Sequence, residues 1–107
     1  MQQISAPELA RLLEEPGGDA IQLLDVREDW EFELGHLPAS THVPMQRIPA
    51  EIGRLDPQRP LVCICHHGMR SMQVAMYLSH QGFNRVLNLA GGIDAWSREV
   101  DPSCPAY

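Results

Sequence analysis

The segment Leu61–Ser71, LVCICHHGMRS, contains the clearest structural pattern in this chain. Its first five residues are an apolar run that follows Pro60, and they predict a buried central strand over Leu61–Cys65. A loop containing Gly68 comes next, and apolar residues then recur at helical spacing from Ser71 to His80. A buried strand, a glycine-containing loop and an apolar helix form the basic unit of a parallel α/β sheet, so we expect an α/β fold.

The same alternation of helices and strands extends outward on both sides of this segment. A capping box that starts at Ser5 predicts a helix over residues 6–15, which the glycines after Pro16 end. Further strands are expected over residues 21–26, 41–43 and 85–89, and further helices over residues 28–33, 48–55 and 93–96. Strands and helices that alternate at this spacing indicate a parallel sheet with helices on both faces.

Length, charge and cysteine content exclude several classes of protein. A chain of 107 residues with 44% hydrophobic content fits one domain, which we expect to span residues 1–107. The formal charge of −6 argues against a nucleic-acid or anionic-membrane surface, because such surfaces need clustered basic residues. Three cysteines are too few for a disulfide scaffold, and neither a secretory signal nor an apolar run of membrane length is evident. We therefore expect a cytoplasmic protein.

Cys65 lies at the carboxyl end of the predicted central strand, where parallel sheets bind their ligands. The helix that follows would offer free backbone N–H groups and a partial positive charge at this point. Gly68 lets the loop bend inward, so that its amides can converge on the sulfur. These donors, together with Arg70, favour the thiolate over the thiol. Cys65 is therefore predicted to be a nucleophile.

Four segments, one of them the loop at Cys65, resemble the rhodanese homology family, in its short single-domain bacterial form, over nearly the whole chain. They are LDVRE at residues 24–28, GHLPAS and HVP between residues 35 and 44, CHHGMRS at residues 65–71 and LAGGIDAW at residues 89–96. The resemblance implies an α/β domain with a five-stranded parallel core and helices on both faces. One departure concerns Ala39 and Ser40, which stand where Gly-Ala is usual after GHLP and affect the geometry of that turn.

In this family the loop cysteine attacks a sulfane sulfur, as in thiosulfate, and forms a persulfide that a thiophilic acceptor such as cyanide or a thiol removes. The resemblance implies that Cys65 is the nucleophile of a thiosulfate sulfurtransferase that needs neither cofactor nor metal. The residues expected to bind the substrate are those of the loop: His66, His67, Gly68, Met69, Arg70 and Ser71. The expected partners are a small-molecule donor and acceptor, and a thioredoxin-like or other sulfur-acceptor protein would also suit an exposed persulfide.

Two other functions use the same fold. Dual-specificity phosphatases of the cell-cycle type also have a cysteine at the start of an arginine-ended loop, but that loop is one residue longer because a phosphoryl group has three oxygens to bind. Here four residues separate Cys65 from Arg70, which is the sulfurtransferase count. A sulfur-carrier or regulatory module is the second alternative. Inert family members typically lose the cysteine, so the presence of Cys65 argues against an inert module.

A metal site is the remaining chemical interpretation of this segment. Its candidate ligands are Cys63, Cys65, His66 and His67, but adjacent histidines on a tight loop do not easily converge on one ion. Cys63 and Cys65 also lack the C-x2-C spacing of a zinc knuckle. We therefore expect no metal here, and we expect Cys63 to be a small buried hydrophobic residue.

Other notable side chains are expected to have structural roles. Asp25 and Arg27 are predicted to pair near the carboxyl edge of the sheet. Met72 and Met76 could line an acceptor pocket, but their helical spacing favours the core. Cys104 lies in the tail, where a free surface thiol is the expected state.

Overall fold

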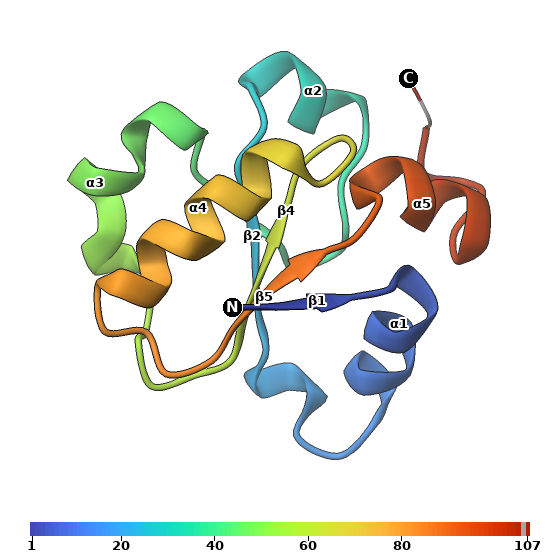
Figure 1. Ribbon diagram of the computed structural model, residues 1–107. Coiled ribbons are helices and arrows are strands. Elements are labelled where there is room, and N and C mark those ends of the chain that lie inside the picture. Colours follow the sequence, from blue (N-terminus) through green and yellow to red (C-terminus); the bar gives the residue numbers. More distant parts are fainter. Residues whose placement is uncertain (106) are drawn as a thin grey trace.

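Five parallel strands form the centre of the protein, as a computed structural model of residues 1–105 and 107 shows (Figure 1). Their order is β1-β5-β4-β2-β3. The strands are β1 (Gln2–Ile4), β2 (Gln22–Asp25), β3 (Thr41–His42), β4 (Leu61–Ile64) and β5 (Val86–Leu89). Every residue of β4 is 0% exposed, because β2 and β5 flank it and helices cover both faces. The predicted central strand and the five-stranded parallel core are confirmed.

Of the five α-helices, α1 and α5 cover one face of the sheet, α3 and α4 cover the other, and α2 lies at the end of the sheet near the loop between β4 and α4 (Figure 1). They are α1 (Ala6–Glu14), α2 (Asp29–Leu34), α3 (Ile48–Glu51), α4 (Met69–His80) and α5 (Gly92–Glu99). Short 3-10 turns occupy Gly18–Ala20, Met45–Arg47 and Ile52–Arg54. Within the described part of the chain, no helix has the length and apolar content that a membrane span requires.

The core has two layers because side chains alternate along each strand. In β4, Val62 and Ile64 point to the layer beneath α1 and α5, whereas Leu61 and Cys63 belong to the layer beneath α3 and α4. Burial raises the pKa of Cys63, which therefore behaves as the expected apolar core residue.

The sequence pattern missed one strand and misjudged the extent of two helices. The missed strand, β1, is a short edge strand in which only Ile4 is buried, so it has too few apolar residues to give a periodic signal. The helix expected over residues 48–55 ends at Glu51 and continues as a 3-10 turn. The last helix extends beyond the expected residues 93–96 in both directions.

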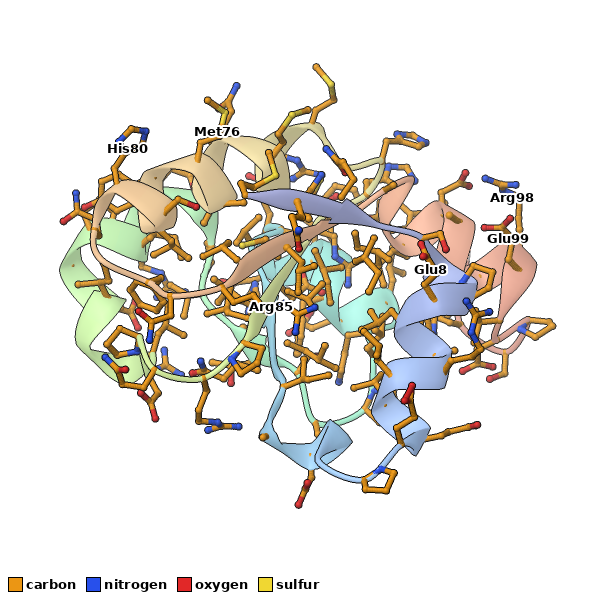
Figure 2. All side chains as sticks on the ribbon, turned by 60° about the horizontal axis from the view of Figure 1, so that its bottom comes forward. Glu8, Met76, His80, Arg85, Arg98 and Glu99 are labelled. Carbon is orange, nitrogen blue, oxygen red and sulfur yellow. The ribbon has the colours of Figure 1, made fainter. Side chains whose placement is uncertain are left out.

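The sequence predicted that Met72 and Met76 lie in the core and that Cys104 is a surface thiol, and both predictions are wrong. Met76 is 51% exposed and points outward from α4 beside His80 (Figure 2), and Met72 is only partly buried. The helix packs through Val74, Ala75 and Leu78 instead, so the face that the methionines share is turned away from the core.

The second of these errors concerns the tail. Cys104 is 6% exposed and belongs to the core layer beneath α1 and α5. The tail folds back because the hydroxyl of Ser97 donates a hydrogen bond to the carbonyl of Cys104, and the Cys104 N–H donates to the carbonyl of Asp101. Burial raises the pKa of the Cys104 thiol and disfavours its reactive form.

Ala39 offers a test of the one departure from the family pattern. Its φ of 63° lies in the left-handed region, which costs an L-residue about 1–2 kcal/mol and explains the usual glycine. Replacing Ala39 with glycine would remove this cost, but part of the gain would be offset because glycine makes the unfolded chain more flexible. We expect Ala39→Gly to raise the free energy of unfolding by about 0.5–1 kcal/mol in urea titrations. An unchanged or lower value would contradict this explanation of the turn.

Candidate active site

The loop between β4 and α4 closes around the sulfur of Cys65, which is 1% exposed. The Gly68 N–H donates a hydrogen bond to Sγ over 3.0 Å, and the Ser71 hydroxyl lies 3.2 Å from the same sulfur. Gly68 makes this bend with a φ of 104°, which an L side chain rarely adopts. One loop amide, that of Gly68, thus donates to the sulfur, whereas the single hydroxyl proton of Ser71 goes to Asn88 and leaves the Ser71 oxygen facing Sγ.

Asn88 holds two parts of this loop from the neighbouring strand β5. Its Nδ2 donates to the carbonyl of Gly68 over 3.1 Å, and its Oδ1 lies 2.5 Å from the Ser71 hydroxyl. Its side chain also donates to Gln3 of β1 over 3.0 Å. Sequence reasoning missed Asn88, although a buried amide inside the apolar run VLNL is a usable signal, because buried polar groups need partners.

The first turn of α5 holds the outer side of the same loop. The N–H groups of Ile93 and Asp94 donate to the carbonyls of Cys65 and His66 over 2.8 and 3.1 Å. Gly92 makes this approach possible, since a Cβ there would lie 2.3 Å from the Cys65 oxygen and 2.4 Å from the His66 oxygen. The carbonyls of Cys65 and His66 thus turn outward to α5, which ties this part of the loop to the helix.

Arg70 pairs with a carboxylate that the sequence did not reveal. Its two terminal nitrogens donate to the two oxygens of Glu31 in α2, over 2.7 and 2.9 Å. Glu31 is 3% exposed, and its hydrogen bonds with Arg70 lower its pKa to about 2. The same bonds raise the pKa of Arg70. Arg70 lies at the expected end of the loop, but both of its terminal amino groups bind Glu31.

Tyr107 connects this ion pair to a second one. Its hydroxyl donates to Glu31 over 2.6 Å and accepts from Arg27 over 3.0 Å. Arg27 in turn pairs with Asp25 over 2.7 Å, and both side chains are fully buried. This confirms the predicted pairing of Asp25 with Arg27. Burial opposes the charge of Arg27, but its bonds to Asp25 and Tyr107 leave its pKa above the ordinary value.

The two loop histidines lie at the rim of the site. The ring of His66 stacks on that of Tyr107, with 4.0 Å between centroids, and on that of His67, with 3.9 Å. Burial, and then the neighbouring His67, lower the pKa of His66, so its ring is neutral at neutral pH. His67 is exposed, and so is Met69, with 69% of its surface accessible. His66, His67 and Met69 therefore lie on the solvent-facing side of the loop.

The histidines approach one another more closely than the sequence suggested. Ligand atoms of His66, His67 and Asp94 lie within 4.8 Å of one another, so adjacent histidines do converge here. Asp94 already accepts a hydrogen bond from Arg98 over 3.1 Å. Cys63 and Cys65 both lie in the core layer beneath α3 and α4, and neither belongs to this group, so the cysteine and histidine ligand set considered from the sequence is not assembled among the described residues.

Comparison with known proteins identifies the family. A family model described as a rhodanese-like domain matches residues 5–99. The chain belongs to the rhodanese-like domain family. It is 40% identical over 102 residues to the "Putative sulfurtransferase YtwF" of Bacillus subtilis, covering 95% of this chain and 96% of the relative. It is 39% identical over 98 residues to the "Thiosulfate sulfurtransferase GlpE" of Pseudomonas aeruginosa, covering 92% and 86%.

The solved structures agree with this assignment. SSP1007 from Staphylococcus saprophyticus superimposes with a TM-score of 0.84 at 30% identity, covering 94% of this chain and 97% of that one. The rhodanese resemblance and the fold that it implied are thus confirmed, and relatives at about 40% identity are named sulfurtransferases. The roles assigned to individual loop residues remain predictions.

Gly92 and Gly82 form a matched pair for testing the contact between the loop and α5. Both have positive φ, at 60° and 91°, but a Cβ at Gly82 would meet nothing within 4 Å. We expect Gly82→Ala to cost about 1 kcal/mol of stability and to keep the reactivity of Cys65. Gly92→Ala should displace the loop and slow the alkylation of Cys65 by iodoacetamide at least about tenfold, read by intact mass. Equal alkylation rates in the two variants would contradict the role of this contact.

Glu31 predicts a specific dependence of stability on pH. Because its pKa in the folded protein is about 2, below the ordinary 4.5, the ionised carboxylate stabilises the fold above about pH 4.5. This contribution is lost as the pH falls toward 2. We expect Glu31→Gln to lower the free energy of unfolding by about 2–3 kcal/mol at neutral pH and by much less near pH 2.5. Glu33→Gln, at an exposed position on the same helix, is the control. A loss of unfolding free energy in Glu31→Gln that does not change with pH would contradict the assignment.

Proposed function

We propose that this protein is a sulfurtransferase that moves a sulfane sulfur from thiosulfate or a thiol persulfide to a thiophilic acceptor through a persulfide on Cys65. The observation that carries the proposal is the loop around Cys65, where the Gly68 N–H and the Ser71 hydroxyl lie 3.0 and 3.2 Å from Sγ. The names of the relatives at about 40% identity support the same reaction class.

In the first half-reaction, the Cys65 thiolate attacks the sulfane sulfur of the donor and forms a new sulfur–sulfur bond. With thiosulfate, the old sulfur–sulfur bond breaks and its electron pair leaves with sulfite. In this proposal, loop N–H groups donate to the negative charge that the outer sulfur carries. Asn88 keeps Gly68 and Ser71 in place through its bonds to both.

In the second half-reaction, an acceptor such as cyanide or a thiolate attacks the outer sulfur of the persulfide. The bond between the two sulfurs breaks, the outer sulfur leaves with the acceptor, and the electron pair returns to Cys65 as a thiolate. Exposed His67 and Met69 on the loop are the side chains that a small thiol or a cysteine of an acceptor protein would contact first. His66 is neutral at neutral pH because burial lowers its pKa, and this half-reaction gives it no role as a base.

The loop geometry supports sulfur transfer over phosphoryl transfer. A phosphoryl group needs donors for three oxygens, whereas an outer persulfide sulfur is one atom. Here one side of Sγ is occupied by the Ser71 hydroxyl, and both terminal nitrogens of Arg70 bind Glu31. A regulatory module without chemistry would have no use for an enclosed cysteine with such donors.

Intact mass spectrometry tests the proposed nucleophile. After treatment with thiosulfate and removal of the excess, the protein should be heavier by one sulfur atom, and cyanide should restore its original mass. Cys63→Ala and Cys104→Ala should behave in the same way, since both thiols are buried and burial raises the pKa of each. Cys65→Ser should neither gain mass nor turn over, while its circular dichroism stays unchanged. An adduct that persists in Cys65→Ser would show that another residue is the nucleophile.

A further inference from the structure

We propose that Glu31 is a specificity-determining residue: by neutralising Arg70 it makes the Cys65 site favour thiol persulfides over thiosulfate as sulfur donors. This inference rests on the proposed function and concerns only its donor. It follows from the charges around the loop and from the chemistry of the rim.

Thiosulfate is a compact dianion, so a site that prefers it needs uncompensated positive charge near the sulfur. Arg70 is the arginine of the loop, yet both of its terminal nitrogens bind Glu31. The Glu31 side chain is only 4% exposed, so its negative charge is poorly screened by water. The guanidinium and the carboxylate therefore present almost no net charge to an incoming anion.

The nearby cations on the surrounding elements are compensated in the same way. Arg27 pairs with Asp25 in full burial, and Arg98 of α5 pairs with Asp94 over 3.1 Å. His66 is neutral because burial lowers its pKa. Histidine rings do not supply a fixed charge at neutral pH. Among the described residues of the loop, α2 and α5, each arginine thus has a carboxylate partner, and the chain as a whole carries a formal charge of −6.

The rim around this neutral entrance is aromatic and apolar. Trp30 of α2 is 56% exposed and meets the ring of Tyr107 edge-on at 5.8 Å, while Tyr107 stacks on His66. Met69 adds an exposed thioether on the loop itself. Such groups contact carbon atoms, which an organic persulfide has and thiosulfate lacks.

The persulfide reaction also places less charge on the leaving group. The Cys65 thiolate attacks the outer sulfur of R–S–SH, the bond between the two donor sulfurs breaks, and R–S⁻ leaves with the electron pair. Cys65 then carries the outer sulfur and its proton as a persulfide. The leaving thiolate has one charge at the reacting centre, whereas sulfite has two, so the persulfide donor depends less on a cation at the entrance.

The test compares how fast each donor loads Cys65 in wild type, Glu31→Gln and Glu33→Gln. Rapid-quench intact mass gives the second-order rate constants for thiosulfate and for glutathione persulfide, and circular dichroism checks the fold. Glu31→Gln leaves the charge of Arg70 without a partner. The rate constant of this variant with thiosulfate should therefore rise about tenfold, which is the effect of one nearby charge. Its rate constant with the persulfide should change less than about twofold. Glu33→Gln removes the same formal charge from an exposed position on the same helix and should change neither.

A second measurement does not depend on how the variant folds. In the wild type, the thiosulfate rate constant should stay level or rise with added salt, because no uncompensated cation attracts the dianion. A fall with salt would show that Arg70 binds thiosulfate as a free cation and would overturn the inference, as would an unchanged donor ratio in folded Glu31→Gln. Failure of both donors to load Cys65 in the wild type would instead contradict the proposed function.

Discussion

The loop around Cys65 depends on two backbone hydrogen bonds, in which the first turn of α5 binds the carbonyls of Cys65 and His66. A peptide unit has its oxygen and its N–H on opposite sides, so carbonyls that turn outward help to leave loop amides that turn inward. The approach requires Gly92, where a side chain would collide with both oxygens. Two segments that are distant in the sequence, CHHGMRS and LAGGIDAW, therefore form one site (Figure 1).

A chain of charged and hydrogen-bonded side chains then fixes the open side of the loop. It runs from Asp25 at the end of β2 through Arg27, Tyr107 and Glu31 to Arg70. Burial makes each member dependent on its partners, because an unpaired buried charge is costly. The burial of Tyr107 and its bond to Glu31 raise its pKa to about 12, so the hydroxyl remains a proton donor across the physiological range. In this network each of the two arginines is paired with a carboxylate, which removes net charge from the surroundings of the loop.

Much of this could be predicted from the sequence, since the buried strands, the strand-loop-helix at Cys65 and the motifs of the family are local patterns. The features that were missed depend on tertiary contacts. Glu31 looks like an ordinary surface residue of an acidic helix until Arg70 is brought beside it. The strand Gln2–Ile4 is defined by its pairing with β5, and Cys104 is buried because the tail folds back. Asn88 was different, since an amide within an apolar strand is visible in the sequence itself.

The central claim is that this loop is built to hold one additional sulfur on Cys65. The most direct measurement is a crystal structure of protein that has been treated with a sulfur donor and freed of the excess. We expect density for a single extra atom bonded to Sγ of Cys65 and within hydrogen-bond distance of loop N–H groups, with Gly92 and α5 in unchanged positions. An unmodified Cys65, an adduct on Cys104, or a loop that must open away from α5 to accommodate the sulfur would contradict the account.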